Sequence, residues 1–147
     1  MTTLLPGNIS DPAVIRRVLT TPSTWAVVGL STDAARTAYG VARWMNEALG
    51  QRIIPVHPRA EQVWGETGYP SLTQIPDGTA VTVVDFFVNS RRVGPLVDEA
   101  ILNKDRLGIA TLWLQLGVID QDAAQRALNA GLDVVMDTCP MIEFPKL

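Results

Sequence analysis

Short apolar runs alternate with amphipathic stretches along the chain. Each run is rich in valine, isoleucine or aromatic residues and is shorter than a typical buried helix, so it predicts a β-strand. The runs are apolar throughout rather than at every second residue, which is typical of strands covered on both faces in a parallel sheet. The expected strands span residues 25–30, 52–56, 80–88, 109–116 and 133–136.

The stretches between these runs carry apolar residues at helical spacing. Ser10 or Asp11 before Pro12 predicts the start of the first helix, and Asn89 or Ser90 predicts the start of another. The expected helices have apolar faces over residues 14–19, 38–49, 93–101 and 120–130. A further helical turn is expected at Ser71, because Ser71-x-x-Gln74 fits a capping box.

This alternation predicts an α/β fold. We expect a Rossmann-like, doubly wound, mostly parallel five-stranded sheet with helices on both faces. A length of 147 residues fits one domain, residues 1–147, with 1–10 as a flexible lead. Ligands of such sheets bind beyond the carboxyl ends of the strands. A site is therefore expected among residues 29–36, 56–59, 87–91, 115–118 and 137–140.

Charge and composition narrow the classes of partner. The net charge is −3, and basic and acidic residues are interspersed, which argues against a nucleic-acid partner. No segment approaches the roughly 18 to 20 apolar residues that span a bilayer, so we expect no membrane insertion. A single cysteine, Cys139, forms no internal disulfide, and the N-terminus lacks signal-peptide features. These features predict a cytoplasmic protein; composition gives no signal of oligomeric state, and a homodimer is compatible with it.

The turn after the first expected strand, in WAVVGLSTDAARTAYG, has the context of an anion site but only one early glycine. Gly29 permits a sharp turn and a close approach to the backbone, although a tight strand-to-helix turn alone would also explain it. The second and third glycines of a dinucleotide fingerprint are missing. NAD is further disfavoured because His57, Pro58 and Arg59 stand where an acidic ribose ligand is expected, whereas Arg59 could pair with an additional ribose phosphate.

Several motifs together resemble one family. They are VVGLS, the step Arg36-x-Ala-Tyr39, PVHPR at 55–59, VWGETGYPSLTQIP at 63–76, LWLQLGV at 112–118 and the ending VVMDTCPMIEF. In this order and spacing, over residues 14–147, they resemble the stand-alone coenzyme A-binding proteins, which are related to the CoA-binding domain of the succinyl-CoA synthetase α subunit. The resemblance implies a Rossmann-like cytoplasmic protein that holds CoA non-covalently.

The resemblance also implies which residues bind the ligand. The turn after the first strand would hold the pyrophosphate, Arg36 would lie beside it, and the segment 55–59 would border the adenosine. Cys139 is added because it follows the last strand on the same side. The expected binding residues are Gly29, Leu30, Ser31, Arg36, Tyr39, Val56, His57, Pro58, Arg59, Gln115, Gly117 and Cys139.

The chain departs from the family pattern at three positions. His57 replaces the usual asparagine, Val88 stands where an arginine often occurs, and Thr138 replaces the arginine of Asp-Arg-Cys. Arg91 and Arg92 could compensate for a lost charge, or could form a solvated helix start.

Other residues have two interpretations each. Cys139 could form a reversible mixed disulfide with a thiol cofactor or be an inert buried thiol. Asp85 could be a functional acid or a buried carboxylate satisfied by loop N–H groups. Trp64 and Trp113 could stack on adenine or pack within the protein. His57 is the only histidine, which excludes a histidine-rich metal site.

The favoured hypothesis is a protein that binds CoA or acyl-CoA without autonomous catalysis. The α subunit that it resembles needs a second domain with a phosphorylated histidine, for which 147 residues leave no room. Two alternatives stay open: an NADP-dependent reductase that uses the same turn and Arg59, and an interaction domain with a vestigial pocket.

Overall fold

The computed structural model describes residues 7–147, and its centre is a five-stranded parallel sheet. The strand order is β2-β1-β3-β4-β5, and every neighbouring pair is parallel, which confirms the doubly wound fold. The strands are β1 (Thr24–Val28), β2 (Arg52–Val56), β3 (Val83–Phe86), β4 (Thr111–Leu114) and β5 (Asp133–Met136). The regular ladders of β3 and β4 are shorter than the apolar runs that predict them, because the ends of those runs already form loops.

Four helices occur where the sequence predicts them. The helical elements are α1 (Pro12–Thr20), α2 (Thr37–Leu49), η1 (Leu72–Gln74), α3 (Ser90–Leu107), α4 (Gln121–Asn129), α5 (Pro140–Glu143) and η2 (Phe144–Lys146). No helix is predicted after β5, where the structure has α5 and η2. Both are single turns, too short to show an apolar periodicity.

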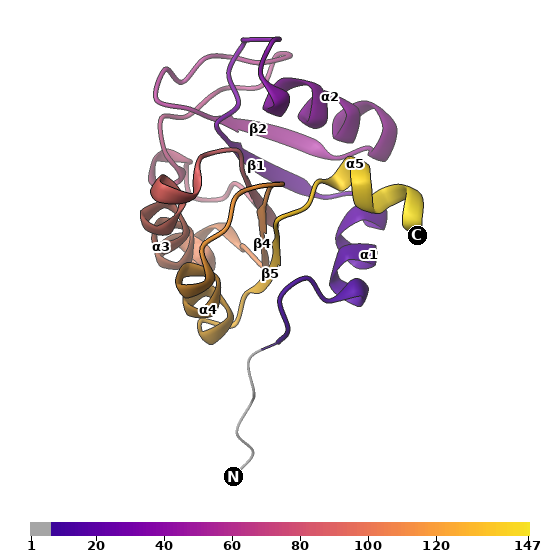
Figure 1. Ribbon diagram of the computed structural model, residues 1–147. Coiled ribbons are helices and arrows are strands. Elements are labelled where there is room, and N and C mark those ends of the chain that lie inside the picture. The colour runs from indigo at the N-terminus through magenta and orange to yellow at the C-terminus, as the bar shows by residue number, and fades with distance from the viewer. Residues whose placement is uncertain (1–6) are drawn as a thin grey trace.

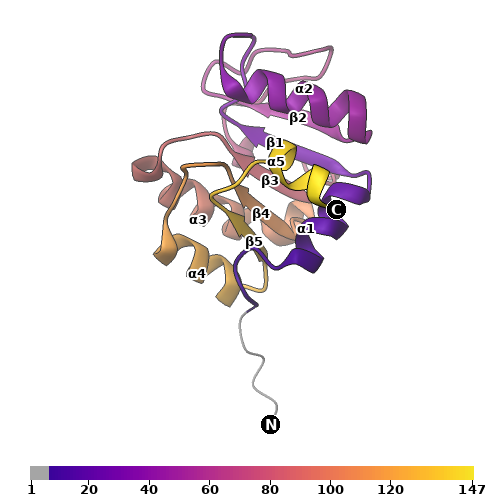
Figure 2. The same ribbon diagram turned by 45° about the vertical axis from the view of Figure 1, so that its right-hand side comes forward.

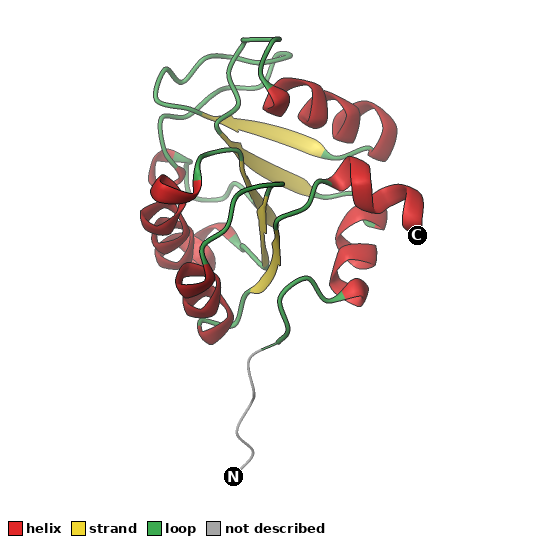
Figure 3. Ribbon diagram, in the orientation of Figure 1, coloured by secondary structure: helices red, strands yellow, loops and turns green. Residues whose placement is uncertain are grey.

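Helices cover both faces of the sheet, as Figures 1 and 2 show from two directions. Successive strand residues point to opposite faces. Val27 and Trp113 pack with α1 and α2, whereas Val28 and Leu114 pack with α3 and α4. In Figure 3 the yellow strands accordingly lie between two sets of red helices. Burial on both faces explains why the strands read as continuous apolar runs.

Local caps account for most helix starts. Side-chain oxygens of Asp11, Asn89 and Asp120 each accept a backbone N–H bond from the first turn of α1, α3 and α4 at 2.9–3.1 Å. The expected capping role of Ser71 is wrong, since its side chain makes no cap bond to η1. The N–H of Leu72 instead donates to the Glu99 carboxylate at 3.3 Å.

The expected flexible lead lies partly outside the described residues, which begin at Gly7. Within the described part, the N–H of Ser10 donates to the carbonyl of Val134 at 2.8 Å, so this end of the segment is held against β5. Within residues 7–147 no helix is both long and apolar enough to cross a membrane.

The turn after β1 brings the backbone close to the end of β3. Gly29 has a φ of +102°, and its N–H donates to the carbonyl of Val56 at 2.7 Å. A Cβ at this position would collide with the carbonyl oxygen of Phe87 and lie 3.2 Å from its Cβ. Both the positive φ and the close approach require glycine here.

We expect Gly29→Ala to lower the free energy of unfolding by about 1–3 kcal/mol, because it adds backbone strain and a collision. Gly40→Ala is the matched control, since a Cβ at this position in α2 meets nothing within 4 Å. It should raise stability by about 0.5–1 kcal/mol. Urea denaturation of both variants measures these changes, and a Gly29→Ala protein as stable as the parent would contradict the account.

Candidate functional site

A cavity of about 1080 Å³ lies beyond the carboxyl ends of the strands. Residues that follow each of the five strands line it, and so do the start of α2 and residues of α3 and α5. Seven of the expected binding residues are brought together in its wall: Gly29, Arg36, Val56, His57, Pro58, Gln115 and Cys139. The cavity also spans the position between β1 and β3 where the winding direction reverses, which is the usual ligand position in this fold.

Five expected residues do not line the cavity: Leu30, Ser31, Tyr39, Arg59 and Gly117. Leu30 is buried in the core that includes α2. The Ser31 hydroxyl accepts from the N–H of Asp33 at 3.2 Å, and the N–H of Gly117 donates to Asp137 at 2.8 Å. These contacts shape the loops, and a ligand contact from these residues stays a prediction.

Arg59 points to a partner within its own loop. Its Nε donates to Glu61 at 3.2 Å, and Glu61 also accepts from the Thr32 hydroxyl at 2.9 Å. The N–H of Arg59 donates to Nδ1 of His57 at 3.1 Å. A phosphate near Arg59 would therefore have to compete with Glu61.

His57 presents a neutral imidazole to the cavity. Burial, followed by the Arg59 cation, lowers the pKa of His57 below its ordinary value of 6.5. Because Nδ1 accepts a bond, Nε2 carries the proton and is the available donor.

Two arginines in the cavity wall have free guanidinium groups. Within residues 7–147, the side chains of Arg36 and Arg92 make no hydrogen bond or ion pair, and both line the cavity. Arg91, next to Arg92, does not line it. The acidic residue in the wall, Glu99, already accepts bonds from Leu72 and Thr73. The cavity therefore has positive charge available for an anion.

The N-terminus of α2 opens into the same cavity. Thr37 and Ala38 line it, and among the described residues nothing accepts from their N–H groups. The helix has no side-chain cap and no acidic residue in its first turn. Free N–H donors and the positive end of the helix dipole favour an anion at this position.

A buried carboxylate fixes one polar side chain of the wall. Asp85 is fully buried, and both of its oxygens accept from Nε2 of Gln115, at 3.0 and 3.1 Å. The buried carboxylate is thus satisfied by a side-chain amide rather than by loop N–H groups. Burial raises the pKa of Asp85 well above 3.8, although the bond from Gln115 opposes this.

Cys139 lies at the same end of the sheet, after β5. Its side chain is buried, and desolvation raises the pKa of the thiol above 9.0, with Asp85 adding to the shift. The thiol form is therefore favoured at neutral pH, which lowers its reactivity.

Both tryptophans considered for adenine stacking contact another aromatic side chain of the protein, Trp113 in the core and Trp64 at the surface. Trp113 is fully buried, with its ring centroid 5.8 Å from that of Trp25, and its Nε1 donates to the carbonyl of Thr138 at 2.9 Å. Trp64 lies 5.0 Å from the ring of Tyr39 and donates to its hydroxyl at 3.1 Å. Neither tryptophan lines the cavity.

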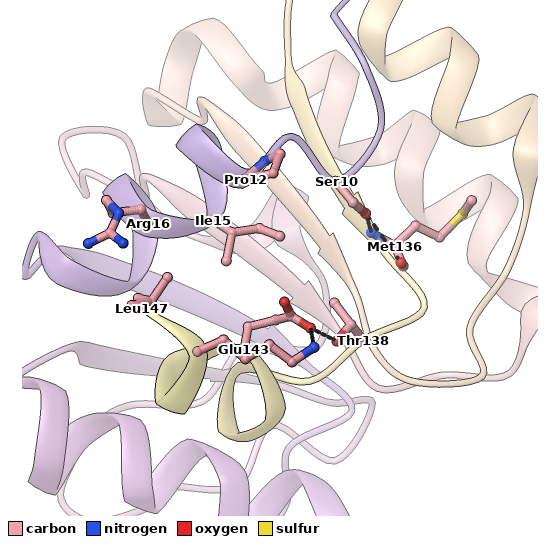
Figure 4. A pocket seen from close by; sticks show the side chains of 9 residues that line it. Ser10, Pro12, Ile15, Arg16, Met136, Thr138, Glu143 and Leu147 are labelled. Atoms are coloured by element: carbon pink, nitrogen blue, oxygen red, sulfur yellow. Dashed lines mark hydrogen bonds and ion pairs between the residues drawn. The ribbon is translucent and has the colours of Figure 1, made fainter.

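A second cavity, of about 450 Å³, lies between α1 and the C-terminal turns (Figure 4). Its wall includes Ile15 and Arg16 of α1, and Glu143, which accepts from the Thr138 hydroxyl at 2.6 Å. None of the expected binding residues lines this cavity. The larger cavity is therefore the candidate site.

The wall of the larger cavity also contains residues that sequence reasoning missed. They include Thr37, Ser71, Met141 and Ile142. Leu116 also lines the cavity; it lies within the expected site range 115–118 but is not among the expected binding residues.

The chain is similar to a family model, to a curated protein and to a solved structure. A family model described as a CoA binding domain matches residues 23–145. The chain is 35% identical over 127 residues to the uncharacterized protein YneT of Bacillus subtilis, covering 86% of this chain and 89% of YneT. It superposes on a hypothetical protein from Pyrococcus horikoshii with a TM-score of 0.82 at 33% identity, covering 100% of this chain and 99% of that one.

Part of the chain is also similar in sequence to an enzyme subunit. The chain is 32% identical over 63 residues to the α subunit of the ADP-forming acetate–CoA ligase II of Pyrococcus furiosus. The match covers 43% of this chain and 14% of the subunit.

Asp85→Asn should make stability less dependent on pH. The folded state raises the pKa of Asp85, so its contribution to stability is fully present below about pH 3.8 and is lost as the pH rises through the folded-state value. Asparagine stays neutral and can still accept from Gln115. Relative to the parent, the free energy of unfolding of Asp85→Asn should therefore increase between about pH 4 and pH 8.

Urea denaturation across this pH range checks the prediction. Asp105→Asn is the control, because its side chain is 94% exposed and should show no such trend. A constant difference between Asp85→Asn and the parent at every pH would show that burial does not disfavour the Asp85 carboxylate.

Proposed function

Because the chain belongs to the CoA binding domain family, we propose that the cavity at the strand ends binds coenzyme A or an acyl-CoA, with the pyrophosphate at the N-terminus of α2. One observation supports this position above all. The uncapped start of α2 and the free guanidinium of Arg36 lie together in the wall, beside the turn at Gly29.

A pyrophosphate matches the chemistry of this corner. Its oxygens can accept from the N–H groups of Thr37 and Ala38, which have no other acceptor among the described residues. Arg36 and Arg92 supply the compensating charge, and hydrogen bonds between ions are stronger than those between neutral groups. The missing glycines of the dinucleotide fingerprint do not argue against this pyrophosphate position, because the N–H donors belong to the start of α2.

The adenosine is proposed to lie near the end of β2. His57 and Pro58 line the cavity at this end, and Nε2 of His57 can donate to an adenine or ribose acceptor. The reductase and the interaction-domain alternatives have no specific observation in their favour.

We propose binding without an autonomous reaction. The thiol in the wall, Cys139, has a raised pKa and is held in its protonated form. The lone histidine, His57, belongs to the opposite end of the strand order. The wall therefore does not pair the Cys139 thiol with the His57 imidazole.

We expect Arg36→Ala and Arg92→Ala each to weaken CoA binding by about tenfold or more, since each removes a charged partner of a phosphate. Arg91→Ala is the matched control, because Arg91 neighbours Arg92 but lies outside the wall. Its affinity should stay within about twofold of the parent. Isothermal titration with CoA, and with NADP in parallel, measures these values.

Two results would contradict the proposal. The first is that the parent protein shows no binding of CoA at all. The second is that Arg91→Ala loses as much affinity as Arg36→Ala, which would mean that net charge rather than the cavity determines binding.

A further inference from the structure

Large apolar side chains are exposed in the wall of the cavity. Leu116 is 62% exposed, Met141 45% and Ile142 42%, and all three line the cavity wall. They come from the loop after β4 and from α5. Three such residues on one wall form an apolar surface without a partner among the described residues, and such surfaces commonly mark binding sites.

The charged residues of the wall belong to other segments. Arg36 follows β1, and Arg92 and Glu99 belong to α3, which follows β3. The wall residues that follow β4 and β5 carry no charged side chain: they are Gln115, Leu116, Val118, Cys139, Met141 and Ile142. The last two strands of the order β2-β1-β3-β4-β5 thus lead into the uncharged part of the wall.

The length of the pantetheine arm is compatible with this wall. The arm has about twelve bonds between the pyrophosphate and the sulfur, as many as about four extended residues, and so reaches about 14 Å. Neighbouring strands are about 4.8 Å apart, so the ends of β1 and β5 are about 14 Å apart. Because α5 also packs against α2, a pyrophosphate at the start of α2 leaves the sulfur within reach of the wall residues that follow β5.

We propose that Leu116, Met141 and Ile142 form a subsite for the acyl group of an acyl-CoA, so that apolar acyl thioesters, rather than free CoA, are the preferred ligands. This inference rests on the proposed CoA site. An acyl chain covers the exposed apolar surface, whereas the thiol of free CoA leaves most of it in water. The neutral thiol of Cys139 and the amide of Gln115 leave the subsite without a charge that would oppose an apolar chain.

Isothermal titration with CoA, acetyl-CoA and hexanoyl-CoA tests the subsite. Each fully buried methylene group strengthens binding by about fourfold. Because the subsite is partly open, we expect hexanoyl-CoA to bind about tenfold more tightly than acetyl-CoA, or better. Leu116→Ser and Ile142→Ser should reduce this ratio toward one, because each removes apolar surface that the longer acyl chain covers.

Leu102→Ser is the control variant. Leu102 is 82% exposed on α3 and does not line the cavity, so this substitution should leave the ratio unchanged. Equal affinities for acetyl-CoA and hexanoyl-CoA would overturn the acyl subsite and leave the CoA site standing. If the ratio of the hexanoyl-CoA to the acetyl-CoA affinity is unchanged in both serine variants, Leu116 and Ile142 do not form the acyl subsite. Failure of all three ligands to bind would overturn the proposed function itself, and the subsite with it.

Discussion

The parallel alignment of the five strands is the constraint on which the site depends. Between two parallel strands the chain must return to the end of the sheet where the first strand began. All five strands therefore have their carboxyl ends on the same side of the sheet. Five loops therefore meet there and enclose a cavity that no single segment could form. Gly29 permits this convergence, since any side chain at its position would collide with the Phe87 carbonyl and separate the turn after β1 from the end of β3.

This arrangement places unlike chemistry in the wall of one cavity. The start of α2 and Arg36 offer N–H donors and positive charge, while Leu116 and α5 offer apolar surface. A ligand that suits this wall is anionic in one part and apolar in another, with a flexible arm between the two parts. Coenzyme A thioesters have this form, which is why the family assignment and the shape of the wall support each other.

Local signals in the sequence predict the fold well, and long-range pairing explains what they miss. The strands follow from β-branched runs, and the caps Asp11 and Asn89 act within their own helices. By contrast, the partner of Asp85 is Gln115, thirty residues away, and no local pattern reveals it. Likewise, motif spacing marks Arg59 as a phosphate ligand, but its bond to Glu61 appears only once the loop is folded.

A crystal structure of the protein with bound coenzyme A tests the central claim most directly. The account predicts the pyrophosphate within hydrogen-bond distance of the N–H groups of Thr37 and Ala38 and of the Arg36 guanidinium, with the sulfur beside the end of β5. Coenzyme A in the smaller cavity beside α1, or in the larger cavity with its pyrophosphate away from α2, would contradict it.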